Sequence, residues 1–379
     1  MEAVYLDNAA TTPMDPQVIS VMQKQMTQTF GNASTPNYYG HAARAVLDQA
    51  RQTIAQSIHA QTGEIVFTSG GSEGDNTAII STALYYQKNG RHIITSQIEH
   101  EAVLKSLHYL EGLGFEVTYL PVDDQGRITV SQVQRALRPD TILVTIMFVN
   151  NEVGVINPIA GIGNLLQDHQ AIFHTDAVQA YGTQIIDVQA LKVDLLTTSA
   201  HKLYGPKMLG FIYERQEIQV PPLIHGGDQE NKRRAGTENV PAIAGFAQAV
   251  KINQALLDQQ GAAQLTAKKE LLLQELRQNQ VEFQVNGPQP QLASPNIINL
   301  WFPHQATDIL QIKLDLAGFV VSGGSACTAG SLEPSHVLIA MYGADSPRVR
   351  ESIRVSFNKF NTAAQIKAFA QSIAQITLA

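Results

Sequence analysis

A short apolar run leads directly into polar residues in the stretch Val193-Asp-Leu-Leu-Thr-Thr-Ser-Ala-His-Lys-Leu-Tyr-Gly-Pro206. We predict a buried strand over residues 193–197, followed by a sharp turn that holds Lys202 in place. Similar runs rich in Val, Ile and Thr alternate with amphipathic stretches. They cover residues 64–68, 91–95, 116–120, 141–147, 171–174 and 210–213. This alternation is typical of a parallel sheet covered by helices on both faces, so the predicted fold class is α/β.

The pattern changes in the last third of the chain. Leucines spaced among Gln, Lys and Glu predict long helices from residue 242 to about residue 280. The stretch Asn286-Gly-Pro-Gln-Pro-Gln291 then breaks any regular element, and a strand-like run follows at Asn296-Ile-Ile-Asn-Leu-Trp301. We therefore expect a second, smaller domain at the C-terminal end.

Composition narrows the class of protein. The 379 residues are 44% hydrophobic and 16% charged, which excludes a disordered tail, a coiled coil and a collagen-like polymer. The net charge of −7 has the wrong sign for binding a phosphate backbone, so no direct contact with nucleic acid is expected. No apolar stretch is long enough to span a membrane, and the first residues lack the features of a secretory signal. A cytoplasmic protein is expected.

The chain has one cysteine, Cys327, within Ser322-Gly-Gly-Ser-Ala-Cys-Thr-Ala-Gly330. A single thiol excludes an internal disulfide, a CxxC redox pair and a four-thiolate metal site, and no metal is expected. The Gly and Ser content predicts that the thiol lies on a mobile loop, whereas the alternative is a buried cysteine that acts as a small hydrophobic residue. A nucleophilic thiol would need a cationic neighbour or deprotonation by a bound substrate or cofactor.

Three motifs follow predicted strands, at the edge where parallel sheets bind ligands. Thr68-Ser-Gly-Gly-Ser-Glu-Gly-Asp75 would present backbone N–H groups to an anion, or form only a tight turn with a helix N-cap. In His174-Thr-Asp-Ala-Val-Gln179, Asp176 could pair with a pyridinium nitrogen or cap the next helix. Lys202 could bond covalently to an aldehyde cofactor or be an ordinary surface lysine.

Other motifs are ambiguous when taken singly. His100 could begin a helix or stack on a ring, and Asn150-Asn151-Glu152 could be only a turn. Arg354 could bind a substrate carboxylate in a bidentate manner or have a structural role. The stretch Lys232-Arg-Arg-Ala-Gly-Thr-Glu-Asn239 could be a solvated basic patch.

Taken together and in this order, the motifs resemble the cysteine desulfurases of the NifS/IscS type, class V aminotransferases among the pyridoxal-phosphate enzymes of fold type I. The resemblance covers nearly the whole chain. It rests on Tyr5-Leu-Asp-Asn-Ala-Ala-Thr-Thr-Pro13, Phe30-Gly-Asn-Ala-Ser34, Glu99-His100, Val149-Asn-Asn-Glu-Val-Gly154, Ser199-Ala-His-Lys-Leu-Tyr-Gly-Pro206, His225-Gly-Gly227, Arg234-Ala-Gly-Thr-Glu-Asn239, Ser325-Ala-Cys-Thr328 and Ser352-Ile-Arg354.

The resemblance implies a large cofactor-binding domain over residues 15–255, with a mostly parallel seven-stranded sheet. Residues 1–14 and 256–379 would form the smaller α+β domain, with the cysteine loop at about residues 322–333. The resemblance also implies pyridoxal 5'-phosphate as the cofactor and a homodimer as the active form.

It further implies a role for each matching residue. Lys202 would bond the cofactor aldehyde, Asp176 would keep the pyridine nitrogen protonated, and His100 would stack on the ring and exchange protons with the substrate. Gln179 and Asn151 would bond the phenolic oxygen. The phosphate would be held by Gly71, Ser72, Ser199 and His201, and by Thr237 from the second subunit.

The implied reaction removes sulfur from L-cysteine. Arg354, assisted by Asn32, would bind the substrate carboxylate, and Cys327 would attack the substrate sulfur to leave L-alanine and an enzyme persulfide. The sulfur would then pass to an acceptor protein, such as an iron–sulfur scaffold or a thiolation enzyme. The sequence does not identify this acceptor or decide between cysteine and selenocysteine.

The chain departs from the usual family pattern in a few places. Gly31-Asn-Ala-Ser-Thr-Pro-Asn37 lacks the usual histidine, Ser322-Gly-Gly-Ser replaces the commoner Ser-Ser-Gly-Ser, and Ala235 stands where Ser is frequent. Two alternatives remain open. One is another fold-type I aminotransferase or lyase, including a selenocysteine lyase, in which Cys327 is incidental. The other is a non-catalytic sulfur-transfer or assembly protein.

Overall fold

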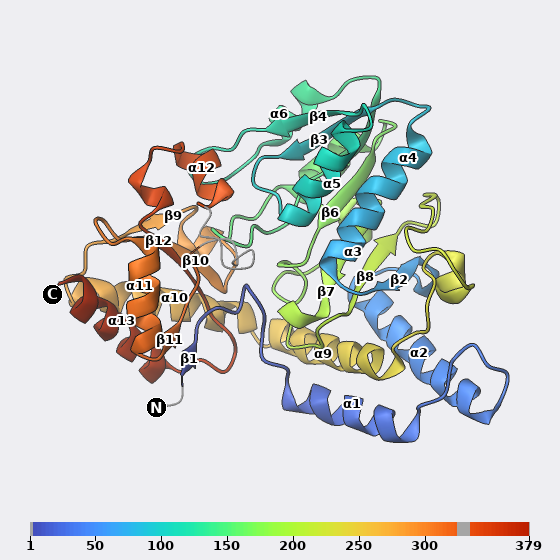
Figure 1. The fold of residues 1–379 in the computed structure, drawn as a ribbon, viewed down its shortest axis with the longest axis horizontal. Coiled ribbons are helices and arrows are strands. Elements are labelled where there is room, and N and C mark those ends of the chain that lie inside the picture. Colours follow the sequence, from blue (N-terminus) through green and yellow to red (C-terminus); the bar gives the residue numbers. More distant parts are fainter. Residues whose placement is uncertain (1–2, 324–333, 379) are drawn as a thin grey trace.

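The structure is a computed structural model that describes residues 3–323 and 334–378. Its main feature is a seven-stranded sheet in the order β2-β8-β7-β6-β5-β3-β4 (Figure 1). The strands are β2 Ile65–Thr68, β3 His92–Ser96, β4 Glu116–Leu120, β5 Thr141–Thr145, β6 Ile172–Asp176, β7 Leu195–Ser199 and β8 Gly210–Glu214. Only β8 runs against the other strands. The predicted α/β fold with a mostly parallel sheet is confirmed.

Each of the seven predicted apolar runs is one of these strands, but one run was predicted too long. Residues 146 and 147 do not extend β5, because the Met147 amide leaves the ladder and donates to the Glu99 carboxylate at 2.9 Å. The amides of residues 146 and 148 still donate to β6, at the His174 and Asp176 carbonyls, so the ladder is lost only on the side of β3, where Glu99 takes the place of a strand partner.

Successive strand residues point to opposite faces of the sheet, as the pleat requires. Ile93, Leu143 and Leu195 pack beneath α4 Thr82–Tyr86 and α5 Glu101–Glu111. The next residue of each strand packs on the other face against three helices, α2 Tyr38–Ser57, α7 Ile159–Leu166 and α9 Val240–Asp258. Both faces are therefore covered, which explains the nearly continuous apolar runs in the sequence.

Polar residues at the helix starts fix where the helices begin. Asp15 accepts a hydrogen bond from the Gln17 amide at the start of α1 Pro16–Gln28, and Asn37 accepts one from the Gly40 amide at the start of α2. Both helices pack on α9 (Figure 1). The remaining helices of this part are α3 Gly71–Asn76, α6 Val130–Ala136 and α8 Val188–Leu191.

The C-terminal part has its own sheets and its own core. It contains the antiparallel sheet β12-β10-β9 and the parallel pair β1-β11. Its elements are α10 Gly261–Gln278, β9 Gln284–Asn286, β10 Ile297–Trp301, α11 Thr307–Leu316, β11 Phe319–Val320, α12 His336–Tyr342, β12 Ser352–Ser356 and α13 Ala363–Thr377, joined by β1 Val4–Tyr5 from the N-terminus. Leu6 packs in the same apolar cluster as α10, α11 and α13.

The helical stretch predicted from residue 242 to about 280 is therefore two helices. They are separated at Gln260, whose φ of +61° is left-handed and ends α9. The division into residues 15–255 against 1–14 and 256–379 stays a prediction. Among the described residues, no helix combines the length and the apolar character that a membrane span needs.

Phe246 offers a test of how α9 is held on the sheet. Its ring is fully buried and lies 5.9 Å from the Phe211 ring and 6.3 Å from the Tyr181 ring. Phe246→Ala should lower the free energy of unfolding by about 3–5 kcal/mol, because it removes a large side chain from a packed core. Urea unfolding followed by circular dichroism measures the change.

Lys251→Ala is the control, because Lys251 is exposed on the same helix. Its free energy of unfolding should stay within about 0.5 kcal/mol of that of the parent protein. Equal effects of the two substitutions would show that α9 does not depend on this contact.

Candidate active site

Polar segments gather at one edge of the large sheet. The strands β2, β3, β5, β6 and β7 run in the same direction, so their carboxyl ends lie at the same edge, where open parallel sheets bind ligands. The predicted site residues follow these ends: Gly71 and Ser72 after β2, His100 after β3, Asn151 after β5, Asp176 and Gln179 at and after the end of β6, and Ser199 and Lys202 at and after the end of β7.

Lys202 ends a single 3-10 turn, Ala200–Lys202, directly after β7. Its half-buried amine donates to the carbonyl oxygens of Ala9 at 2.6 Å and Ala10 at 2.9 Å. It is therefore not a solvated surface lysine. Burial and the charge of Arg354 lower the pKa of Lys202 to about 8. An amine with such a pKa is partly deprotonated near neutral pH and can attack an aldehyde.

Asp176 is the last residue of β6 and is almost completely buried. Its Oδ1 atom accepts a hydrogen bond from the Val178 amide at 2.8 Å, which holds the carboxylate at the strand end. The alternative prediction that Asp176 caps the next helix is wrong, because Asp187 caps α8 instead. Its side chain instead stabilises the turn that follows β6.

The charges of Asp176, His100 and Lys202 influence one another. Burial raises the pKa of Asp176, and His100 and Lys202 partly oppose this shift. Burial also lowers the pKa of His100, with Asp176 opposing the shift and Lys202 adding to it. Solvent reaches the His100 ring, but the protein around it still disfavours its charged form. Because such effects decay with distance, each of the three groups lies within range of the charges of the other two.

His100 and Gln179 are held by local hydrogen bonds. His100 is the N-cap of α5, and its Nδ1 atom accepts a hydrogen bond from the Ala102 amide at 3.1 Å. The helix-start interpretation of His100 is therefore confirmed, and the charges of Asp176 and Lys202 also act on the ring. Gln179 is buried and donates from Nε2 to the Ala9 carbonyl at 3.0 Å, the same oxygen that Lys202 binds.

A glycine turn lies between β2 and α3. Gly70 has φ of +146°, which residues with side chains rarely adopt, and a Cβ atom on Gly71 would lie 2.8 Å from the Val178 side chain. Helix α3 continues through a π-helical turn, Thr77–Ser81, into α4. Its first amide groups, from Gly71 onward, have no carbonyl partner within the helix, and such groups bind phosphate.

The other residues predicted to hold a phosphate differ in exposure. Ser199 is buried beside the glycine turn, and Ser72 is exposed. His201 is half-buried, and its Nδ1 atom lies 3.0 Å from the Thr11 hydroxyl. Burial and the nearby charges of Lys202 and Lys207 lower the pKa of His201 to about 4, so its ring is neutral near pH 7.

Arg354 enters the site from β12 and is only 1% exposed. Its Nη2 atom donates to Asp7 Oδ1 at 2.8 Å, and its Nη1 atom donates to the Asn151 carbonyl at 3.0 Å. The Nε atom is buried and has no hydrogen-bond partner among the described residues. Because a guanidinium carries five N–H groups, these two bonds leave donors free for a carboxylate.

A layer of buried ionisable residues lies next to Asp176. His174 Nε2 is 3.7 Å from Asp75 Oδ1, and burial lowers the pKa of His174 to about 3. Burial raises the pKa of Asp75, and the charges of Asp176 and Glu99 add to the shift. Burial likewise raises the pKa of Glu99 to about 8, with hydrogen bonds from Ser96 and Met147 opposing it. Glu99 and His174 are therefore mainly uncharged near pH 7.

The remaining predicted residues lie apart from this cluster or outside the described chain. Asn32, between α1 and α2, and Thr237, before α9, are both exposed. Within residues 3–323 and 334–378 of this single chain, no hydrogen bond or ion pair joins either of them to the cluster. Cys327 and most of its predicted loop lie outside the described residues. Asn37, which stands in place of the usual histidine, caps α2.

Sequence analysis missed the role of the N-terminal segment. Asp7 binds Arg354, and the carbonyl groups of Ala9 and Ala10 receive the Lys202 amine. All three residues lie in Tyr5-Leu-Asp-Asn-Ala-Ala-Thr-Thr-Pro13, one of the motifs on which the family resemblance rests, so the sequence did mark this segment. The motif alone did not show which distant side chains it would meet. Within the described ranges, no cluster of His, Cys, Asp and Glu has the arrangement of a metal site.

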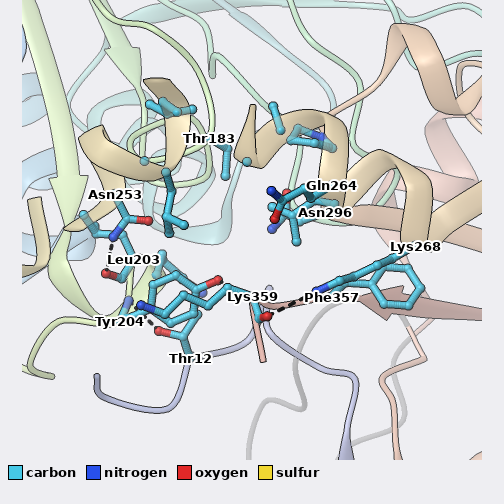
Figure 2. A pocket seen from close by; sticks show the side chains of 18 residues that line it. Thr12, Thr183, Leu203, Tyr204, Asn253, Gln264, Lys268, Asn296, Phe357 and Lys359 are labelled. Atoms are coloured by element: carbon cyan, nitrogen blue, oxygen red, sulfur yellow. Dashed lines mark hydrogen bonds between the residues drawn. The ribbon is translucent and has the colours of Figure 1, made fainter. Parts of the chain in front are cut away.

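A small cavity lies where α9 is followed by α10 (Figure 2), and Lys202 is one of the residues that line it. Tyr204, Asn253, Gln264 and Lys359 are among the residues that line it (Figure 2). Its volume of about 40 Å³ is enough for a few water molecules. Asn253 donates to the Leu203 carbonyl at 2.9 Å beside this cavity, which ties α9 to the turn that carries Lys202.

The fold is α/β, and its candidate site has a buried lysine and a buried aspartate at the carboxyl edge of the sheet. Comparison with known proteins identifies the family to which such a chain belongs. Residues 4–369 match the family model for aminotransferase class-V, and the chain belongs to this family. A protein of Bacillus subtilis, provisionally named cysteine desulfurase IscS 1, is 50% identical over 376 residues, which cover 99% of both chains. The cysteine desulfurase IscS of Dictyoglomus turgidum is 45% identical over 89% of this chain and 85% of its own. A solved NifS-like protein superposes with a TM-score of 0.92 at 34% identity and covers 99% of both chains.

The lowered pKa of Lys202 predicts how its reactivity depends on pH. With an amine-modifying reagent on the cofactor-free chain, Lys202 should reach half of its full reactivity near pH 8, because burial and Arg354 favour the neutral amine. Peptide mapping by mass spectrometry measures this, with the exposed Lys105 as an internal reference. Asp176→Asn should move the midpoint to lower pH, because the carboxylate opposes the shift. A Lys202 midpoint near the ordinary lysine value of 10.5 would contradict this description of the site.

Proposed function

We propose that this protein is an L-cysteine desulfurase that uses pyridoxal 5'-phosphate. The observation that carries the proposal is the Lys202 amine, which is bound to the Ala9 and Ala10 carbonyls at the carboxyl edge of the sheet, has a lowered pKa, and lies within range of the charge of the buried Asp176 carboxylate. Relatives named cysteine desulfurases match over most of the chain and support the choice of reaction.

The residues present fit pyridoxal phosphate. The site offers a nucleophilic amine for the aldehyde, a buried carboxylate for the pyridine nitrogen, and free helix amides beside a glycine turn for the phosphate. When bound, this cofactor acts as an electron sink that makes the bonds around the substrate Cα labile. Lys202 would hold the aldehyde, and Asp176 would keep a proton on the pyridine nitrogen. His100 would stack on the ring, and Gln179 and Asn151 would bond its phenolic oxygen.

The phosphate would be held at the glycine turn and by a second subunit. Gly71, Ser72, Ser199 and His201 would bind it from one chain. Thr237 would come from the other chain of a homodimer. Two features of Thr237 support this arrangement. Its side chain is exposed, and no hydrogen bond among the described residues joins it to the cluster of its own chain. The active form would then need two copies.

L-Cysteine would be oriented by its carboxylate. Arg354 would donate to it with the N–H groups that Asp7 and Asn151 leave free, and Asn32 would assist. Asp7 holds the guanidinium plane in place, so that Arg354 does not have to be ordered when the substrate binds.

Cys327 would accept the sulfur. Its thiolate would attack the substrate sulfur, so that an S–S bond forms on Cys327 as the C–S bond of cysteine breaks. The substrate carbon that loses sulfur would take up a proton, for which His100 and the Lys202 amine are the candidate donors. The product would leave as L-alanine.

The enzyme persulfide would pass its outer sulfur to an acceptor protein for iron–sulfur cluster assembly or for thiolation of tRNA or cofactors. We place this chemistry in the cytoplasm, without a membrane or nucleic acid partner.

Two substitutions test the proposed roles. Lys202→Ala should abolish the lysine adduct that borohydride traps in the loaded protein and reduce alanine formation from cysteine about a thousandfold or more. Cys327→Ser should keep the adduct but form no alanine from free cysteine. Lys105→Ala, at an exposed lysine, should behave like the parent protein.

Three results would contradict the proposal. Full alanine formation by Cys327→Ser would remove the role of the thiol. Amino transfer to a keto acid without sulfide release would instead identify another aminotransferase or lyase. A colourless protein without a borohydride-trapped lysine would favour a non-catalytic role.

A further inference from the structure

An ion pair crosses from the glycine turn to a distant segment of the chain. Arg234 Nε donates to Glu73 Oε1 at 2.9 Å, and Arg234 Nη2 donates to Glu73 Oε2 at 3.1 Å. The Glu73 side chain is 9% exposed and that of Arg234 is 26% exposed, so water screens the pair only in part. Sequence analysis left Arg234 as part of a possible solvated basic patch, and this contact shows otherwise.

Glu73 lies within the turn that would receive the phosphate. It belongs to the first turn of α3, and its Oε2 atom accepts a hydrogen bond from the Ser69 amide at 2.8 Å. The carboxylate thus closes the loop that contains Gly70 and Gly71. Its negative charge, however, opposes the attraction that helix amides exert on a phosphate.

The charge state of Glu73 depends on Arg234. Burial alone would raise the pKa of Glu73, but the hydrogen bonds from Arg234 and Ser69 outweigh burial and lower it. The carboxylate is therefore ionised near neutral pH and is paired with a cation. Without Arg234, a partly buried negative charge would remain beside the anion site.

Arg234 is held in position by the segment that precedes it. Glu230, Asn231 and Lys232 have left-handed φ angles between +48° and +67°, which fold this segment back on itself. Arg51 holds this segment in place by donating two hydrogen bonds of 2.7 Å to the Glu230 carboxylate. Glu230 also accepts from the Phe67 amide of β2 at 3.0 Å, so the segment is docked on the strand that leads into the glycine turn.

We propose that Arg234 is a positioning residue for the phosphate end of the cofactor site: it neutralises Glu73, which lets that carboxylate shape the glycine turn without repelling a phosphate. This inference rests on the proposed function, because it assumes that the turn receives the phosphate of pyridoxal phosphate. It adds a residue pair that touches neither the reacting atoms nor, in this arrangement, the phosphate itself. Arg234 and Thr237 lie on the same short segment. The Arg234–Glu73 ion pair therefore also connects the glycine turn of one chain to Thr237, which would bind the phosphate in the other chain.

The test compares two probes on the cofactor-free, full-length chain. Pyridoxal 5'-phosphate reports on the whole site, and pyridoxal, which lacks the phosphate, reports on the rest of it. Arg234→Met should weaken binding of pyridoxal phosphate by about tenfold or more, because it leaves the Glu73 charge unpaired beside the anion site. Binding of pyridoxal should change by no more than about twofold to threefold. Arg234→Lys, which keeps the charge, should bind pyridoxal phosphate more tightly than Arg234→Met.

The double variant decides the mechanism. In Glu73→Gln with Arg234→Met, the charge of residue 73 is absent but its side-chain oxygen can still accept from Ser69. Affinity for pyridoxal phosphate should return to within about threefold of the parent protein. A thermal unfolding curve for each cofactor-free variant separates a loss of affinity from a loss of folded protein.

The possible results are distinguishable. Unchanged affinity of Arg234→Met for pyridoxal phosphate would overturn the inference. A double variant as weak as Arg234→Met would also overturn it, because Arg234 would then act on the phosphate directly. Equal weakening for both probes would mean a general disturbance and would overturn the specific role. Failure of the parent protein to bind pyridoxal phosphate at all would instead overturn the proposed function.

Discussion

The site depends on the way the first residues of the chain lie between the two sheets. β1 pairs with β11, and the Asn8 side chain donates to the Ser356 carbonyl at 2.7 Å, so this segment is fixed to the C-terminal part. The Thr12 hydroxyl donates to the His201 carbonyl at 2.8 Å, which fixes the same segment to the large sheet. Between these two anchors, the carbonyl groups of Ala9 and Ala10 receive the Lys202 amine. A shift of the N-terminal segment would therefore displace the Lys202 amine and also Arg354, which is bound to Asp7.

Burial is the second constraint, because it shifts acids and bases in opposite directions. It raises the pKa of Asp176 and Glu99 and lowers that of Lys202. Each shift favours the uncharged form of the group, and for Lys202 this leaves part of the amine able to attack an aldehyde near neutral pH. The same burial disfavours an unpaired charge at the glycine turn, where Glu73 is paired with Arg234.

Sequence predicted the strands well because their apolar runs are short and distinct, and all of these strands except the edge strand β4 are buried on both faces. The reversed direction of β8 and the order of the strands could not be predicted, because they depend on which elements pack together rather than on local pattern. Lys202 and Asp176 were found because both lie at the carboxyl ends of strands, Asp176 as the last residue of β6 and Lys202 in the turn after β7. Asp7 and Arg234 were quoted within motifs but given no partners, since their contacts join residues more than 100 positions apart. Thr237 is predicted to act on a second chain, and Cys327 lies outside the described residues, so their roles stay predictions.

The central claim is that one amine and one thiol of this chain act on the same cysteine molecule. The most direct measurement is to incubate the loaded protein with sulfur-labelled L-cysteine and to locate the label by peptide mass spectrometry under non-reducing conditions. The account predicts one extra sulfur atom on the peptide that contains Cys327, formed together with alanine, and no label when Lys202 is replaced. A labelled peptide in the Lys202 variant, or alanine release from the parent protein with no sulfur on Cys327, would contradict it.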